Sequence, residues 1–432
     1  MVRDEEVLQY CMDALSEKGS DKSQVVLKEA EKHELNVDSD EISLFRTTYN
    51  TELDLIGIDG NKKGSTSVNK TDREAIDDAL ERVEDLVATS SEDEAYDIAP
   101  WQQPQTFDRG PGEPDPDRMH QLLTSFLGDL EDAYPEIMLI QSVLDFERTT
   151  RRLVNSNGVD FSSDQGVYHL HLWFASKDGE KTTSFNGLGL SLSELERELL
   201  DFDFIQENLH QSVQHLQARP FDGKFTGDVI IVPQTVVSLL SMYGYLFLGN
   251  QALISGTSRL KDSLNEQVAS SRLSVHSKPT SEEICDGYFI TPDGFAAEDV
   301  TIIEDGVLRS FLLDQYGANK TGRERASTAG GAYVVDAGEQ ALEELIGGVQ
   351  RGLLVTRYSG GTPNPNGDFS GVAKNSFYIE DGQLAYPVTE TMISGNLLEV
   401  FENIRGISEE SVDFGSAVAP WILSEGVTIS GK

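Results

Sequence analysis

Strand-like segments separated by turn residues limit the folds open to this chain more than any other feature of its sequence. Residues 23–69 have the composition of strands, and the Asp-Gly-Asn sequence at 59–61 is a hairpin signal within them. From about 136 to 189, turn signals at 155–158 and 177–179 separate further short strands. The N-terminal half is therefore predicted to contain an antiparallel meander.

Amphipathic helices are predicted beside these strands. Residues 5–18 and 119–130 carry apolar side chains at helical spacing. Thr71 and Glu74 form a capping box in front of another amphipathic segment, because a threonine followed three residues later by a glutamate can satisfy free amide groups at a helix start. A second capping box predicts a helix over 191–216.

Two changes of character divide the chain. Residues 89–117 contain five prolines and many acidic residues without apolar periodicity, which predicts a linker or a long excursion. The sequence Arg-Pro-Phe-Asp-Gly at 219–223 marks a boundary, and a buried-strand signal at 229–232 and glycine-rich strands follow it. We therefore predict an α+β fold with two lobes, a sheet-and-helix lobe over 1–219 and a β-rich, barrel-like lobe over 224–432.

Charge and cysteine content narrow the classes of function. The formal net charge of −40 argues against binding to nucleic acid or to anionic membranes, although it identifies no substrate. Cys11 and Cys285 are the only cysteines, so no disulfide framework is expected and a reducing compartment is favoured. The N-terminus is acidic without an apolar signal core, and the most apolar stretch, 239–248, is too short to cross a bilayer. These features predict a cytoplasmic protein.

The histidines give no recognisable catalytic metal motif, because neither HExxH nor HExxxH occurs in the sequence. His210 and His215 would lie about 140° apart on a helix, so both are expected at the surface. His169 and His171 alternate on a predicted strand and therefore share a face. This pair is either the beginning of a metal site whose third ligand is not recognisable or part of a polar strand face beside Trp173.

Several blocks in the C-terminal half, in a consistent order, resemble the TldD/PmbA family. These blocks are GVLRSFLLDQYGA at 306–318, TAGG at 328–331, GDFSG at 367–371, FYIEDG at 377–382, PVTE at 387–390 and ISGNL at 393–397. The N-terminal 220 residues agree with the family only in general pattern. The resemblance implies a fold and a function of the kind found in that family of metalloproteases.

The family contains two kinds of chain, and the resemblance places this one in the non-catalytic kind, called PmbA or TldE. Catalytic TldD chains carry HExxxH on the helix after the first C-terminal strand and a cysteine near the C-terminus. Here Ser241 and Leu246 occupy the two histidine positions, Met242 occupies the glutamate position, and no cysteine follows Cys285. The implied function is a subunit without its own cofactor, which pairs with a zinc-containing TldD-like chain that processes peptides and unfolded polypeptides.

Two other functions remain open, as do the residues that would contact a peptide. The chain is alternatively a hydrolase with an unrecognised metal site near His169 and His171, or a stand-alone homodimeric peptide-binding module. The glycine-rich loop 358–371 is either a surface that approaches a partner or peptide or a tight connection. Residues proposed to line an internal chamber near it are Arg357, Ser370, Lys374 and Asn375. The apolar helix at 239–248 is expected in a partner interface or in the core.

Overall fold

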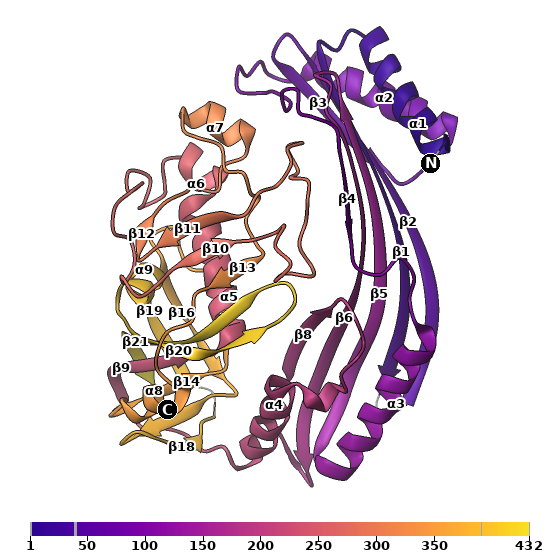
Figure 1. Ribbon diagram of the computed structural model, residues 1–432. Coiled ribbons are helices and arrows are strands. Elements are labelled where there is room, and N and C mark those ends of the chain that lie inside the picture. The colour runs from indigo at the N-terminus through magenta and orange to yellow at the C-terminus, as the bar shows by residue number, and fades with distance from the viewer. Residues whose placement is uncertain (1, 39–40, 390, 432) are drawn as a thin grey trace.

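The computed structural model describes residues 2–38, 41–389 and 391–431. Glu390, which ends the PVTE block, lies outside the described residues. So do Met1, the first residue of the first predicted lobe, and Lys432, the last residue of the second. The described chain forms two lobes, each built on its own sheet, which face one another across most of their length (Figure 1). The predicted α+β fold with a β-rich, barrel-like second lobe is confirmed.

The first sheet is long and mainly antiparallel. Its strands are β1 (Lys22–Asp38), β2 (Glu41–Asp59), β3 (Lys62–Val68), β4 (Gln105–Arg109), β5 (Ile137–Asn155), β6 (Asp160–Asp178), β7 (Lys181–Thr182) and β8 (Asn186–Leu192). They follow the order β3-β2-β1-β5-β6-β4, and β7 and β8 also pair with β6. The predicted hairpin turn is present, because Gly60 and Asn61 both have positive φ between β2 and β3. The meander from β5 to β8 is confirmed.

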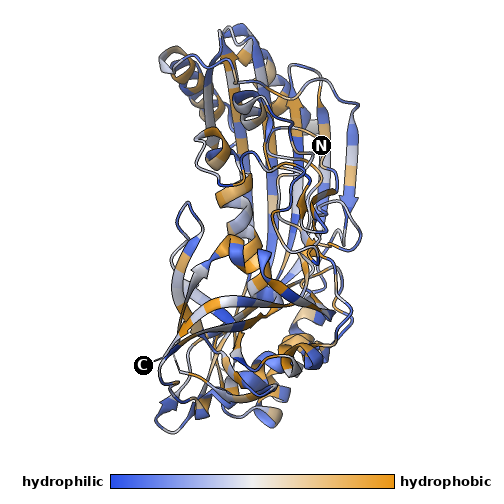
Figure 2. Ribbon diagram, turned by 90° about the vertical axis from the view of Figure 1, so that its left-hand side faces the viewer, coloured by the Kyte–Doolittle hydropathy of each residue, from blue (hydrophilic) through white to orange (hydrophobic). Residues whose placement is uncertain are grey.

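Helices cover one face of this sheet. α1 (Val2–Glu17) and α2 (Arg73–Thr89) share a core with the upper parts of β1 and β2, and α3 (Pro116–Ala133) and α4 (Asp203–Gln214) share a core with its lower half. Cys11 is buried in the first of these cores. Asp72 rather than Thr71 caps α2, because its carboxylate accepts a hydrogen bond from the amide of Ala75. Figure 2 shows hydrophilic and hydrophobic segments alternating along the long strands.

The predicted helix over 191–216 is wrong in its first half. β8 continues to Leu192, and Ser191 pairs with His169 of β6, so the strand takes up the residue expected to cap a helix. The chain then passes through a short 3₁₀ turn (Leu199–Asp201) before α4 begins at Asp203, and a second turn (His215–Gln217) follows it. Pairing within the sheet therefore overrides the local capping signal.

The segment 89–117, predicted to be a linker or a long excursion, lies between α2 and α3 and packs against both lobes. Its strand β4 pairs in parallel with β6, and Ala95 and Ala99 are buried. The Arg109 guanidinium donates hydrogen bonds to three carbonyl groups of the second lobe, and Gln102 bonds to the backbone of the same lobe at Gly294 and Ala296. Apolar contacts add to these hydrogen bonds, because Phe107 stacks on Phe289 with ring centroids 4.9 Å apart and Ala99 shares a hydrophobic cluster with Ile290. The segment therefore joins the two lobes.

The second lobe is a curled sheet with short helices. Its elements are β9 (Lys224–Ile231), α5 (Pro233–Tyr243) and its π-helical extension (Gly244–Leu248), α6 (Asn250–Ile254), β10 (Val275–Ser277), β11 (Val300–Glu304), β12 (Val307–Leu308), α7 (Gln315–Thr321), β13 (Tyr333–Val335), α8 (Leu342–Gly347), β14 (Arg351–Val355), β15 (Arg357–Gly360), β16 (Asp368–Lys374), β17 (Phe377–Glu380), β18 (Gln383–Pro387), β19 (Thr391–Asn396), α9 (Leu397–Glu402), β20 (Ile404–Asp413) and β21 (Val418–Ser430). β9 lies between β14 and β21 at the centre of the sheet.

α5 is partly a core helix. Tyr243 and Phe247 are buried in the largest hydrophobic core of the second lobe, whereas Tyr245 is 59% exposed. The helix therefore buries one face and leaves another toward solvent. Across the described residues, no helix combines the length and the apolar character needed to cross a membrane.

Candidate functional site

A cavity of about 480 Å³ lies between the two lobes. Its N-terminal wall consists of His171 and Trp173 on β6, the Asn186–Gly189 part of β8 and Asn208 of α4. Its C-terminal wall consists of α5 and the residues 356–358 at the start of β15. Because both lobes supply walls, the shape of the cavity depends on how the two lobes pack against each other.

Glycines on β8 leave room for the two aromatic rings of β6. Gly187 and Gly189 lie directly across from Trp173 and His171 in the strand register. A Cβ atom at position 187 would come within 3.2 Å of the Trp173 ring, and one at position 189 within 3.5 Å of His171 Nδ1. A side chain at position 187 would therefore press on Trp173, which is 48% exposed and forms part of the cavity wall.

α5 presents uncharged side chains to the cavity. Gln234, Ser238, Leu239 and Met242 line it, so one face of the helix forms much of the C-terminal wall. These residues recur at positions i, i+4, i+5 and i+8, which is the spacing of one helix face.

The residues at the expected zinc-motif positions do not fit a zinc ion. The Ser241 hydroxyl is exposed and donates to the Val237 carbonyl, Met242 offers only a thioether, and Leu246 packs against the hydrophobic core. Zinc sites of hydrolases need imidazole, carboxylate or thiolate ligands. Within the described ranges, no group of three or more His, Cys, Asp or Glu residues has the arrangement of a metal site.

Arg357 is the charged group of the cavity. Its side chain is half-buried, and its Nε atom is enclosed without a hydrogen-bond partner. Among the described residues, no carboxylate forms an ion pair with it, and burial lowers the pKa of its guanidinium. The adjacent Thr356 hydroxyl is also enclosed without a hydrogen-bond partner. Both residues line the cavity, so two buried donors there have no acceptor among the residues that the structure describes.

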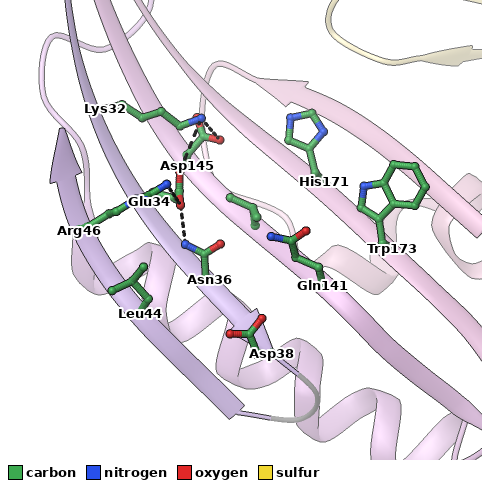
Figure 3. Close-up of a pocket in the computed structure, with 11 residues that line it drawn as sticks. Lys32, Glu34, Asn36, Asp38, Leu44, Arg46, Gln141, Asp145, His171 and Trp173 are labelled. Atoms are coloured by element: carbon green, nitrogen blue, oxygen red, sulfur yellow. Dashed lines mark hydrogen bonds and ion pairs between the residues drawn. The ribbon is translucent and has the colours of Figure 1, made fainter. Parts of the chain in front are cut away.

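A polar groove of about 510 Å³ continues from the cavity across β1, β2 and β5. His171 and Trp173 line both spaces. Figure 3 shows these two residues among the side chains that line the groove. Both cations of the groove are paired, because Arg46 lies 3.0 Å from Glu34 and Lys32 lies 2.9 Å from Asp145. Glu34, Arg46 and Asp145 are direct cross-strand neighbours, which places their side chains on the same face of the sheet.

His169 connects the two lobes at the edge of this groove. Its Nδ1 lies 3.0 Å from Asp145 of β5, and its Nε2 lies 3.4 Å from Asp286 of the second lobe. Ser191 donates a further hydrogen bond of 2.8 Å to Asp286. Burial lowers the pKa of His169, but the two carboxylates raise it more, so that its pKa moves from 6.5 to about 9. His169 is therefore a cation between two carboxylates at neutral pH.

His169 and His171 do not converge on a metal position. Their rings stack with centroids 6.4 Å apart, and both nitrogens of His169 already face carboxylates. The surrounding protein lowers the pKa of His171, chiefly by excluding water, so this side chain is neutral at pH 7. The arrangement of His169 and His171 therefore favours the hypothesis of a polar strand face beside Trp173 over that of a metal site.

The other expected contact residues lie at different depths. Lys374 is the direct register partner of Arg357 on β16, and Ser370 is exposed farther along the same strand. Asn375 is buried with φ of 53° and donates to the carbonyl of Phe185, so it joins the lobes. Of the four residues, Arg357 alone belongs to the cavity wall described above.

The expected surface position of His215 is wrong. This side chain is buried where the lobes meet, with its Nδ1 2.7 Å from the Gln211 carbonyl and its Nε2 3.1 Å from the Ser376 carbonyl. Its ring also packs edge-on against Phe377 at 4.7 Å. The turn after α4 brings it against the second lobe, which helical spacing alone does not reveal.

Asp286 and Thr356 were not identified from the sequence. Asp286 comes close to His169 only because a loop of the second lobe reaches the sheet of the first. Cys285 beside it is not activated, because burial raises the pKa of its thiol to about 11. Thr356 sits in no recognisable motif, so no local signal points to either residue.

Comparison with known proteins agrees with this architecture. Residues 223–431 match the family described as the PmbA/TldA metallopeptidase C-terminal domain. The C-terminal half of the chain therefore carries the domain shared by PmbA/TldD proteins. Relatives in this family include a metalloprotease PmbA homolog of Haemophilus influenzae, 25% identical over 86% of this chain and 84% of that protein. Metalloprotease PmbA of Escherichia coli O157:H7 is 32% identical over 37% of each chain.

Solved structures with the PmbA/TldD fold cover the whole chain. TldE from Thermococcus kodakarensis has a TM-score of 0.82 and 20% identity, covering 99% of this chain and 100% of that one. A putative modulator of DNA gyrase from Bacteroides thetaiotaomicron has a TM-score of 0.87 and 22% identity, with 100% of both chains covered. At these identities the likeness shows a shared fold that includes both lobes. The family resemblance found in the C-terminal blocks is confirmed.

Proposed function

We propose that this chain is the non-catalytic subunit of a PmbA/TldD-type metalloprotease. The observation that carries the proposal is the composition of α5, which keeps its place in the cavity wall while Ser241, Met242 and Leu246 stand where the family resemblance expects zinc ligands and a general base. A hydrolytic zinc centre needs those groups to activate water. A TldD-like partner would supply the zinc and the chemistry.

Peptides and unfolded polypeptides are the proposed substrates, and the cytoplasm is the proposed compartment. The cavity offers aromatic and aliphatic walls, with a few polar groups among them, as peptide-binding sites commonly do. The large negative charge of the chain supports neither a nucleic-acid partner nor a membrane partner. In this proposal the subunit holds or guides the substrate while the partner cleaves it.

Hydrolysis of an unfolded polypeptide by this chain, by a TldD-like chain and by their mixture tests the proposal. The mixture should cleave faster than the partner alone, and this chain alone should be inactive. A mixture made with a partner whose own zinc ligands are replaced should also be inactive. Full activity of the partner without this chain would contradict the proposal.

The two alternatives have their own readouts in the same experiment. A hydrolase with its own metal site would cleave without the partner, hold zinc after dialysis and lose activity in His169→Gln and His171→Gln variants. A stand-alone homodimeric module would bind peptide without cleaving it and would elute as a dimer in light-scattering measurements, with no gain in partner activity.

A further inference from the structure

We propose that the cavity between the lobes is a carboxylate-binding subsite in which Arg357 anchors an acidic group of a peptide. The inference deepens the proposed function and rests on it for the identity of the ligand as a peptide. The anchoring chemistry itself is a property of this chain and is measurable without any partner.

The charge of the cavity wall carries the first part of the argument. Asp and Glu make up 74 of the 432 residues, yet the described residues lining the cavity include neither. His171 is neutral at pH 7 because its pKa is lowered, so Arg357 bears the one formal charge of that wall. A carboxylate entering this cavity meets an unpaired cation in a protein that otherwise repels acidic ligands.

The unpaired donors carry the second part. A buried charged or polar group without a partner lowers stability, so native proteins seldom keep one without a reason. Arg357 Nε and Thr356 Oγ1 are both enclosed without hydrogen-bond partners. A guanidinium binds a carboxylate through two parallel hydrogen bonds, which is the strongest neutral-pH pairing open to it. A bound carboxylate would therefore supply the acceptor that Arg357 lacks.

The walls beside Arg357 fit the rest of a peptide residue. Trp173 and Tyr358 provide aromatic surface, and Leu239 and Met242 provide flexible aliphatic surface. A cavity volume of about 480 Å³ lies within the usual range for sites that bind small ligands. The carboxylate comes either from the C-terminus of a peptide or from an aspartate or glutamate side chain, and the same guanidinium chemistry serves both.

The test is isothermal titration of this chain, without a partner, with short synthetic peptides of one parent sequence. One peptide has a free C-terminus and no acidic side chain, one has a C-terminal amide and one glutamate, and one has a C-terminal amide and no acid. Arg357→Met removes the charge while keeping an unbranched side chain, and Arg357→Lys restores it. Arg309→Met is the matched control, because Arg309 is paired with Glu304 2.9 Å away and lies outside the cavity.

At least one acid-bearing peptide should bind about 10- to 100-fold more tightly than the peptide without an acid, the range expected for a charge-assisted hydrogen-bonded pair. Whichever acidic peptide binds identifies the source of the carboxylate. Arg357→Met should abolish this preference, Arg357→Lys should recover part of it, and Arg309→Met should keep it.

Equal affinity for all three peptides, no binding at about millimolar concentration, or a preference that survives Arg357→Met would overturn the inference. Melting temperatures of the variants accompany the titrations, so that a loss of binding cannot be confused with a loss of fold. The proposed function fails separately, through the hydrolysis assay with the partner, because that assay does not depend on which peptide group this chain holds.

Discussion

The groove and the cavity share His171 and Trp173 but treat charge in opposite ways. In the groove, Arg46 and Lys32 lie within 3.0 Å of carboxylates on neighbouring strands of one sheet. In the cavity, the guanidinium of Arg357 has no such partner among the described residues. Charges that form ion pairs fix the positions of the side chains that carry them. A buried charge without a partner lowers stability and is available to a ligand.

This difference assigns separate tasks to the two spaces. The ion pair of Lys32 with Asp145 in the groove continues through His169 to Asp286 of the second lobe. We call these contacts the groove network, and they also hold the second lobe against the first. Replacing a groove charge should therefore lower the free energy of unfolding, whereas replacing the cavity charge should not.

The largest expected effect is that of Asp145→Ala. Asp145 is fully buried and holds both His169 and Lys32, so its loss leaves two cations without their shared carboxylate. Removing one partner of a buried ion pair lowers the free energy of unfolding by about 3–5 kcal/mol. Urea denaturation followed by circular dichroism measures this loss.

The matched control is Asp164→Ala, which breaks the pair with Arg148 on the same sheet. Both side chains of that pair are more than one third exposed, so its loss should lower the free energy of unfolding by less than about 1 kcal/mol. Equal losses in the two variants would show that the groove network is no more structural than an ordinary surface pair.

The second effect is a pH dependence set by His169. Its pKa is about 9 in the folded state and 6.5 in the unfolded reference, so its stabilisation is complete below pH 6.5 and is lost as the pH rises through 9. At 1.36 kcal/mol per pKa unit, the loss reaches up to about 3 kcal/mol. His171, whose pKa is lowered, acts in the opposite direction, because deprotonation near pH 6.5 favours its folded form.

Comparison with His169→Gln isolates this contribution. The pKa values of Asp145 and Asp286 are lowered, despite burial, mainly by His169, so their contribution is present near neutral pH and is lost only in acid. Between pH 6.5 and 9 the variant should therefore show a flatter stability profile than the unmodified chain. Parallel profiles would mean that His169 does not bridge the lobes in solution.

The third effect concerns the segment 89–117, which contacts the second lobe through Arg109. Arg109 donates to the carbonyls of Pro279, Thr280 and Ile284, and its guanidinium lies 4.6 Å from the Phe289 ring centre. Arg109→Ala should lower the free energy of unfolding by about 2 kcal/mol and open residues 89–117 to limited proteolysis. Arg82→Ala, on the exposed face of α2, should change neither by a measurable amount. First cuts within 89–117 in the unmodified chain would contradict this assignment.

Local chemistry made the elements of the fold predictable. The turn at 59–61 and the helix stripes depend on residues close together in sequence, so their patterns are legible without tertiary contacts. The failures have non-local causes. Ser191 belongs to a strand because it pairs with His169. His215 is buried because the turn after α4 brings it against the second lobe.

The residues of the candidate site were harder to predict from the sequence than the helices and strands. Arg357 was identified only because it precedes a glycine-rich loop, and nothing local indicates that it has no carboxylate partner among the described residues. Thr356 and Asp286 acquire their roles from distant segments that meet them in the folded chain. Ion pairs here join residues that are far apart in sequence, so composition and spacing predict which charges exist but not which have a partner.

The smallest expected change in stability is also the sharpest test of the comparison. Arg357→Met replaces an unpaired, half-buried cation by a side chain that suits the aliphatic wall of Leu239 and Met242, so the free energy of unfolding should stay unchanged or rise by about 1 kcal/mol. Arg46→Met in the groove removes a partner of Glu34 and should lower it by about 1 kcal/mol. Thermal melts of both variants at pH 7 show whether each substitution raises or lowers stability. A substitution that stabilises the chain while abolishing peptide binding is expected of a residue kept for its ligand, because such residues are retained despite their effect on the fold. If Arg357→Met instead destabilises the chain as much as Arg46→Met, the guanidinium has a structural partner in solution, and the contrast between groove and cavity does not hold.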